Sequence, residues 1–187
     1  MKKPTFVGIA GGSASGKTTL ANLLFEKLPF LRVKVLHADQ YYKKVLPKTT
    51  APFTGIVYDD YNQPDSLYLD RMYQDLCSAA SEDWHVVIAE GLFILQDNRI
   101  RGLLDIKIYV DCRSDERAVR RLRRNMAKGL DFDEVANVMM DSVRYRHDEF
   151  VESSRWYADL VVNGSAMPQR GVDAILAWIQ QQYRMIQ

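Results

Sequence analysis

GIAGGSASGKTT, at residues 8–19, is the stretch that decides the fold of this chain. It continues a β-rich apolar run that predicts a strand at 5–10. It leads into TTLANLLFEKL at 18–28, where leucines recur at helical spacing up to Pro29. The glycine-rich segment therefore joins the end of a strand to the start of a helix.

This segment matches G-x-x-x-x-G-K-[ST], the phosphate-binding P-loop, at Gly11, Gly16, Lys17 and Thr18. Glycines let backbone N–H groups wrap an anion, and the helix N-terminus adds partial positive charge. Lysine then reaches the outer phosphates, and the threonine hydroxyl can ligate Mg²⁺. A glycine turn followed by an exposed lysine is the alternative, but the strand and helix around it favour a nucleoside triphosphate site. The predicted ATP-binding residues here are Gly11, Gly12, Ser13, Ala14, Ser15, Gly16, Lys17, Thr18 and Thr19.

Strand and helix patterns alternate along the rest of the chain. Further strands are predicted at 33–38, 85–90, 105–111 and 159–163, and further helices at 64–80, 114–128, 132–156 and from 171 onward. Residues 41–63 read as an irregular, tyrosine-rich loop, a length that is uncommon unless it is functional. The alternation predicts one α/β domain over 1–187: a P-loop NTPase three-layer sandwich, with a mostly parallel five-stranded sheet and helices on both faces.

Composition narrows the class of protein further. The chain has 187 residues, of which 47% are hydrophobic and 26% charged, and its formal net charge is +1. This near-neutral balance favours neither a nucleic-acid nor a membrane partner. Cys77 and Cys112 have no metal-binding spacing and predict reduced thiols. No signal peptide or membrane span is recognised, so we expect a cytoplasmic protein.

Two carboxylates, Asp39 and Glu90, stand at or just after the ends of predicted strands. Ligands of open parallel sheets bind at that edge. A carboxylate there can hold Mg²⁺ or accept the proton of an attacking hydroxyl. A helix cap or turn residue is the alternative for each. Tyrosines 41 and 42, which follow Asp39, favour a site for a ring-bearing small molecule.

An arginine-rich helix covers ERAVRRLRRNMAKG at 116–129. Arginines over a transferred phosphoryl group stabilise its transition state. Arg121 and Arg124 can reach one side together because they are three residues apart. A solvated basic face is the alternative, and a nucleic-acid surface is disfavoured by the near-neutral charge. The histidines at 37, 85 and 147 lack metal spacing and are expected to be structural or at the surface.

These segments resemble the uridine kinase and phosphoribulokinase branch of P-loop kinases over most of the chain. They occur in the family's order: GGSASGKTT, HADQYYK, DYNQPDSL, VVIAEGLFIL, DIKIYVDCRSDERAVRRLRRN and SSRWYADLVVNG. Uridine kinases transfer the γ-phosphate of ATP to the 5′-hydroxyl of a pyrimidine ribonucleoside. The resemblance therefore implies an ATP-dependent, Mg²⁺-requiring kinase with a nucleoside-like acceptor.

The resemblance also implies residue roles. Asp39 would be the general base, and Tyr42 and Asn62 would lie beside the acceptor sugar. Glu90 would join Thr18 and Asp39 around Mg²⁺. Arg121 would reach the acceptor ribose, Arg124 the ATP phosphates, and Asn163 the adenine. Lys17 completes the catalytic set, and 123–130 would form a helical lid that excludes water.

Several positions depart from the family pattern. Asn62 replaces a usual aspartate that grips the ribose hydroxyls, with Asp59 or Asp60 as substitutes. Only 78–83 separate a predicted helix from Trp84, so the aromatic hairpin of the uracil pocket is absent. Val138 replaces a base-contacting glutamine, and Lys128 and Leu130 replace two lid arginines. A site without these groups discriminates weakly for a base edge.

The sequence thus predicts a kinase of the uridine kinase type, and leaves two alternatives open. Within the class, a nicotinamide riboside kinase would also deliver phosphate to a ribosyl 5′-oxygen. Outside it, a P-loop protein could bind or hydrolyse nucleotide as a switch, without an acceptor. The expected partner is a small-molecule acceptor rather than nucleic acid or membrane. Self-association as a homo-oligomer is left open.

Overall fold

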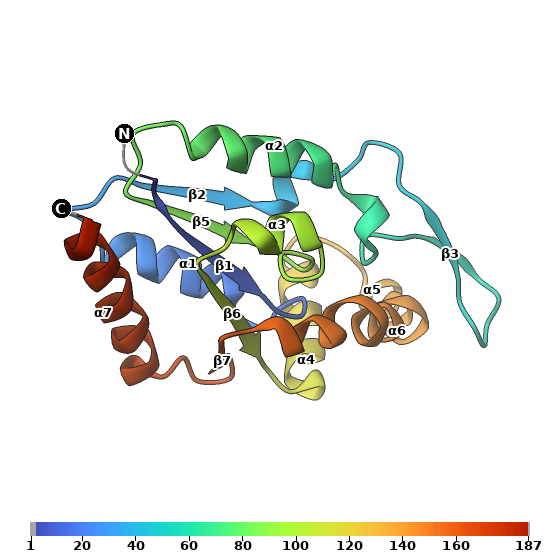
Figure 1. Cartoon of the computed structure of the whole chain (residues 1–187). Coiled ribbons are helices and arrows are strands. Elements are labelled where there is room, and N and C mark those ends of the chain that lie inside the picture. Colours follow the sequence, from blue (N-terminus) through green and yellow to red (C-terminus); the bar gives the residue numbers. More distant parts are fainter. Residues whose placement is uncertain (1–2, 187) are drawn as a thin grey trace.

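The computed structural model describes residues 3–186 and is built around a five-stranded sheet (Figure 1). The strand order is β2-β5-β1-β6-β7, and every neighbouring pair is parallel. All residues of β1 and β5 are buried, as expected for central strands covered on both faces. The predicted five-stranded α/β sheet is confirmed. Its strands are β1 (Thr5–Ala10), β2 (Val33–His37), β5 (Val86–Glu90), β6 (Ile106–Asp111) and β7 (Leu160–Asn163).

Side chains alternate between the two faces of the sheet, which gives the molecule two cores. In β1, Phe6 and Ala10 enter one core, whereas Val7 and Ile9 enter the other. The first core is covered by α2 (Leu69–Ala79) and α3 (Asn98–Leu103). The second is covered by α1 (Lys17–Glu26) and α7 (Gln169–Ile186). The structure is therefore the expected three-layer sandwich (Figure 1).

A helical segment lies beyond the carboxyl ends of the strands. It begins with α4 (Ser114–Met126), turns at Gly129 with φ of 88°, and resumes at α5 (Phe132–Val138). The sequence predicts one helix over 132–156, and the chain indeed stays helical here. However, π-helical turns η3 (Met139–Val143) and η4 (His147–Val151) flank α6 (Arg144–Arg146), and the 3₁₀ helix η5 (Glu152–Tyr157) ends the run. Such π turns are rare and often accompany functional sites.

The prediction that 41–63 is irregular is wrong for its middle part. A short antiparallel hairpin forms there from β3 (Lys48–Thr50) and β4 (Val57–Asp59), and it projects from the body of the molecule (Figure 1). Single 3₁₀ turns, η1 (Ala38–Tyr41) and η2 (Pro64–Ser66), lie on either side of it in sequence. Long-range contacts hold the hairpin: the Tyr58 and Thr54 hydroxyls both donate to Asp141, each at 2.9 Å.

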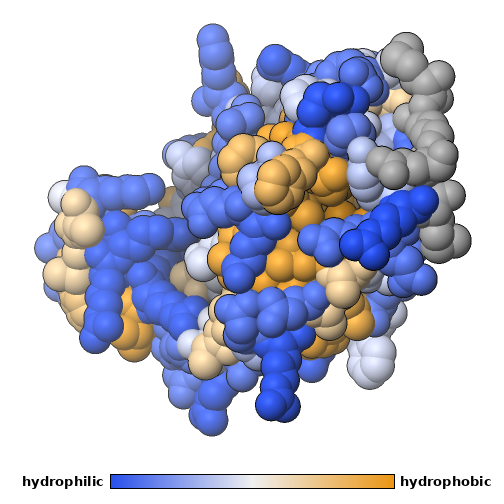
Figure 2. Space-filling model, turned by 90° about the vertical axis from the view of Figure 1, so that its left-hand side faces the viewer, coloured by the Kyte–Doolittle hydropathy of each residue, from blue (hydrophilic) through white to orange (hydrophobic). Residues whose placement is uncertain are grey.

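Figure 2 shows the end of the molecule at which both chain termini lie, where a central hydrophobic area is surrounded by hydrophilic side chains. Strands begin near this end, so their carboxyl ends point to the opposite end, where open parallel sheets bind ligands. Among residues 3–186, the structure contains no helix with the length and apolar character needed to cross a lipid bilayer.

Candidate active site

The P-loop leaves β1 at its carboxyl end and enters α1 at Lys17, as the sequence predicts. Gly11 and Gly16 have φ of 148° and 103°, values that L side chains rarely adopt. A Cβ on Gly11 would also lie 2.5 Å from the backbone oxygen of Val110. The buried Ser15 Oγ has no hydrogen-bond partner. An unpaired polar atom at the base of a glycine-rich turn is consistent with a ligand-binding loop.

Lys17 lies between carboxylates and arginines. Burial lowers the pKa of its ammonium below the ordinary value for lysine. The charges of Glu90 and Asp39 oppose this shift, while those of Arg124 and Arg117 add to it. The lysine therefore lies near Glu90, Asp39 and Arg124, three of the residues that the sequence assigns to the site.

Glu90, at the carboxyl end of β5, connects the P-loop to β2. Its Oε1 accepts a hydrogen bond from the Thr18 hydroxyl at 3.1 Å and lies 2.8 Å from His37 Nδ1. His37 and Glu90 are register partners in the sheet, and Asp39 follows two residues later in η1. The structure thus brings Asp39 and Glu90 to one edge, beside Thr18. Hydroxyl and carboxylate oxygens are the donors that Mg²⁺ prefers, with substrate phosphates completing the set.

Four arginines of α4 lie along three consecutive P-loop residues. Arg121 and Arg124 donate to Ser13 Oγ at 3.0 and 3.2 Å. Arg120 reaches the Ala14 carbonyl at 3.5 Å, and Arg117 packs against Gly12. Within the described part of the chain, Arg121 and Arg124 form no ion pair, and Arg121 Nε has no partner. Burial lowers the pKa of the Arg121 guanidinium, as does the neighbouring charge of Arg124. Such an unpaired cluster favours a bound anion.

The predicted acceptor residues share a cavity of about 780 Å³ with the P-loop. Ser13, Lys17 and Thr18 form one end of it. Asp39, Tyr42, Asn62 and Arg121 line its middle, and Tyr42 donates to the Tyr61 carbonyl at 3.0 Å. Burial, and then the Asp39 charge, raise the pKa of the Tyr42 phenol, so this side chain stays protonated. The far wall is formed by the hairpin residues Lys48, Val57, Tyr58 and Asp59, and by Lys128, Leu130, Glu134, Val135 and Val138.

Asp59 and Asp60, the two residues suggested to replace the charge missing at Asn62, differ in their access to the cavity. Asp60 is fully buried, and its Oδ2 accepts from Arg146 Nε at 2.8 Å. Its other oxygen accepts from the Asn62 backbone N–H, so Asp60 positions Asn62 from behind. Asp59, paired across the hairpin with Lys48 at 2.7 Å, is the one of the two that lines the cavity.

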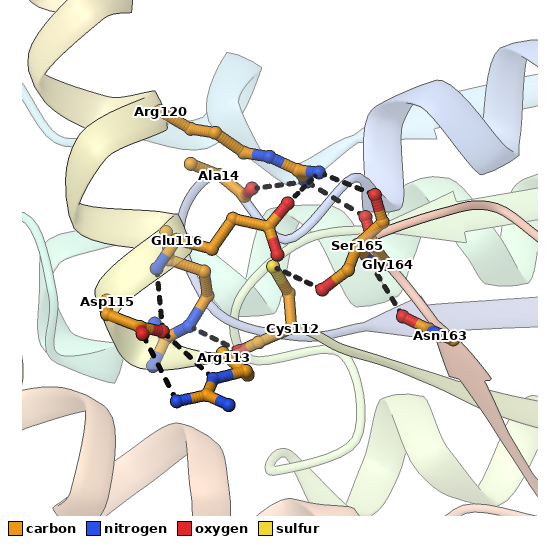
Figure 3. A network of polar contacts seen from close by, with 10 residues as sticks. Ala14, Cys112, Arg113, Asp115, Glu116, Arg120, Asn163, Gly164 and Ser165 are labelled. Carbon is orange, nitrogen blue, oxygen red and sulfur yellow. Dashed lines mark hydrogen bonds and ion pairs between the residues drawn. The ribbon is translucent and has the colours of Figure 1, made fainter.

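A second cavity, of about 480 Å³, lies beside the P-loop and is lined by Ala14 and residues 16–19. Figure 3 shows how Arg120 shapes it: its guanidinium donates to the carbonyls of Gly164 at 2.9 Å and Ser165 at 3.0 Å, and pairs with Glu116. The Asn163 side chain accepts from the Ser165 N–H at 2.9 Å (Figure 3). Gly164, Ser165 and Met167, rather than Asn163, line this cavity. Both cavities share Lys17, Thr18 and Arg124, so they meet at the P-loop.

Comparison with known proteins agrees with this geometry. The sequence model of the phosphoribulokinase / uridine kinase family matches residues 75–172. The chain is 32% identical to a uridine kinase of Bacillus pumilus, with 95% of each chain covered. It is 31% identical to one of Clostridium botulinum, with 96% of this chain and 98% of the relative covered. The chain belongs to the phosphoribulokinase / uridine kinase family. A possible uridine kinase from Bacillus stearothermophilus shares the fold, with a TM-score of 0.55 at 19% identity over 86% of this chain and 89% of that one.

As a member of this family, the chain is an ATP-dependent kinase with the P-loop α/β fold. The link between α2 and β5 contains only turns over 80–85, so the hairpin missing from the sequence is missing from the structure too. The hairpin that does line the cavity comes from an earlier segment. The predicted lid at 123–130 spans the last turn of α4 and the Gly129 turn. Closure of this lid and the single-domain boundaries remain predictions.

Sequence reasoning left three contacts of this kinase unassigned. The sequence predicts a structural or surface role for His37, and the structure places its ring against Glu90. The sequence assigns no separate role to Arg117 or Arg120 within the basic helix, and both contact the P-loop. Positions 117, 120 and 124 follow helical spacing, so one face could have been recognised. Nothing in the sequence indicates that this face lies against the P-loop.

Proposed function

We propose that this protein transfers the γ-phosphate of ATP to the 5′-hydroxyl of a nucleoside-like small molecule. The observation that carries this proposal is the meeting of two cavities at Lys17, Thr18 and Arg124, with Asp39 on one side only. One cavity would hold the nucleoside of ATP, and the other the acceptor. A nucleotide-binding switch has no need for the cavity that Asp39 lines, which at about 780 Å³ is large enough for a drug-sized molecule.

On the donor side, the residues present fit a bound triphosphate. The P-loop N–H groups would hold the phosphates, and Lys17 would contact the outer ones. Thr18, Glu90 and Asp39 would hold Mg²⁺, which supplies charge neutralisation for the phosphates when bound. Arg121 and Arg124, already hydrogen-bonded to Ser13, are positioned to stabilise charge on the transferred group.

On the acceptor side, Asp39 would act as the general base. Its carboxylate would take the proton of the acceptor hydroxyl as that oxygen bonds to the γ-phosphorus. The bond from the γ-phosphorus to the oxygen bridging it to the β-phosphate breaks, and ADP leaves. Tyr42, Asn62 and Arg121 would hold the sugar so that its hydroxyl faces Asp39.

The hairpin β3–β4 would form the wall that contacts the part of the acceptor farthest from the reacting hydroxyl. Val57, Val135 and Val138 give this wall an apolar surface, with the Lys48–Asp59 pair at its edge. Because Val138 cannot hydrogen-bond a base, strict selection for uracil is not expected. This composition keeps nicotinamide riboside beside uridine and cytidine as candidate acceptors.

The test is a panel of acceptors with γ-labelled ATP and Mg²⁺. The panel contains uridine, cytidine, nicotinamide riboside, pantothenate and sugar phosphates, and labelled products are identified by mass spectrometry. The proposal predicts label in one or more ribonucleosides, with ADP formed in equal amount. ADP release without any labelled acceptor, or label in non-nucleoside acceptors alone, would contradict it.

A further inference from the structure

Arg117 is a buried arginine beneath the P-loop. Its residue exposure is 6%, although it lies in the first turn of the otherwise polar helix α4. A Cβ built on Gly12 would meet the Arg117 guanidinium nitrogen at 2.3 Å, so the charged group touches the loop backbone directly. Gly12 and Arg117 both line a third cavity, of about 240 Å³, which shares no lining residue with the two larger ones and is called here the cavity behind the loop.

The charge of Arg117 has no carboxylate partner among the described residues. Its Nε donates to the Cys112 carbonyl at 3.0 Å, and no carboxylate oxygen lies within 4.0 Å of the guanidinium. Two carboxylates that line the same cavity as Arg117 are already paired: Asp111 lies 3.2 Å from Arg155, and Glu152 accepts from Tyr109 at 3.0 Å. Asp148, which also lines the cavity behind the loop, is solvent-exposed.

His147 lies beside the Arg117 guanidinium. Its ring packs near Gly12 beside Arg117, and its buried Nδ1 has no hydrogen-bond partner. Burial lowers the pKa of His147, and the Arg117 charge lowers it further, although the charges of Glu152, at 3.3 Å, and of Asp148 oppose the shift. The Arg117 guanidinium is therefore a buried positive charge that no carboxylate of the described residues contacts directly.

We propose that Arg117 is a positioning residue for the nucleotide, whose unpaired charge attracts the polyphosphate through the loop at Gly12. This inference rests on the proposed function only in that the P-loop binds a nucleoside polyphosphate. A buried charge without a partner destabilises the free protein, and an anion placed across the loop removes that cost. The Arg117 charge therefore lowers the stability of the free protein and raises its affinity for a bound polyphosphate.

Melting temperature and ligand affinity together distinguish an electrostatic role of Arg117 from a structural one. If Arg117 only braced the fold, its removal would lower the melting temperature and affect all ligands equally. If its charge attracts phosphates, Arg117→Met should leave the free protein as stable as wild type, or more so. Affinity should then fall in proportion to ligand charge: little for adenosine, more for ADP, and on the order of tenfold or more for a non-hydrolysable ATP analogue.

The experiment is isothermal titration calorimetry of adenosine, ADP and that analogue, each with Mg²⁺, together with melting curves of the free proteins. Arg113→Met is the matched control, because this neighbouring arginine has an 82% exposed side chain paired with Asp115. It should bind all three ligands as wild type does. Arg117→Lys, which keeps the charge, should retain most of the affinity for the ATP analogue.

Equal loss for the three ligands, or no loss for the ATP analogue, would overturn the inference. If Arg117→Met does not fold, Arg117→Gln is compared with Arg117→Lys, and equal affinities of these two for the analogue would also overturn it. A wild-type protein that binds none of the phosphorylated ligands would instead refute the proposed function. The two failures are therefore distinguishable.

Discussion

Asp60→Asn should destabilise the protein and weaken acceptor binding together. Asp60 is fully buried, and its partner Arg146 has a side chain that is 23% exposed and also pairs with Glu149 at 2.6 Å. Breaking a fully buried ion pair costs about 3–5 kcal/mol. Partial exposure and the retained Glu149 contact reduce this to roughly 2 kcal/mol. At about 2–4 °C per kcal/mol for a chain of this size, the melting temperature should fall by roughly 4–8 °C.

The assay combines calorimetric melting with steady-state kinetics on the best acceptor from the panel. Because Asp60 holds the Asn62 backbone and the base of the hairpin, the KM for the acceptor should rise while that for ATP stays unchanged. Asp59→Asn is the thermal control: its exposed pair with Lys48 contributes at most about 1 kcal/mol. Equal melting temperatures for the two variants would refute the argument that Asp60 anchors this region.

Three further predictions concern single side chains. Lys17→Ala should weaken ATP binding and lower turnover together, as measured by calorimetry and by ADP release; retained turnover would contradict the P-loop assignment. Tyr58→Phe removes one of the two hydrogen bonds that the hairpin donates to Asp141. Because such a bond contributes about 1 kcal/mol, the KM for the acceptor should rise about fivefold while the KM for ATP stays constant. An unchanged KM for the acceptor would argue against the hairpin as a wall of the acceptor site. Burial lowers the pKa of His147, so below about pH 6.5 the unfolded chain takes up this proton first and wild type loses stability on acidification. His147→Asn should lose less stability than wild type between pH 7.5 and 5.5, and parallel melting profiles would contradict this.

The parts of the fold that the sequence predicts are those set by local signals. The five strands are short apolar runs bounded by polar or glycine residues, and the P-loop motif marks the first strand-to-helix turn. Because parallel strands end at the same edge, Asp39 and Glu90 could be placed together without any knowledge of strand order. The strand order β2-β5-β1-β6-β7 itself has no local signal.

The hairpin could not be predicted because its strands are three residues each and its stability comes from distant groups. Tyr58 and Thr54 contact Asp141, more than 80 positions later, and Arg146 reaches back to Thr49. The six-residue helix α3 was missed for a similar reason: its start is signalled only by the Asp97 cap. Short elements need tertiary contacts, which periodicity does not report.

Spacing alone could not divide the arginines of α4 by role. Arg117 and Arg121 are four residues apart and share a helix face, yet one packs beneath Gly12 and the other donates to Ser13. The difference depends on where the helix crosses the P-loop. Family resemblance singled out Arg121 and Arg124, while burial and the missing carboxylate partner single out Arg117.

The most direct test of the central claim is the transfer rate of Asp39→Asn with a ribonucleoside acceptor. Loss of a general base lowers turnover by about 10²–10⁴-fold. The affinity for ATP, measured by calorimetry without Mg²⁺, should stay within about twofold of wild type because Lys17 and the P-loop amides remain. Asp65→Asn, at an exposed position in η2, is the control and should transfer at the wild-type rate. An Asp39→Asn variant that phosphorylates the acceptor as fast as wild type would contradict the account.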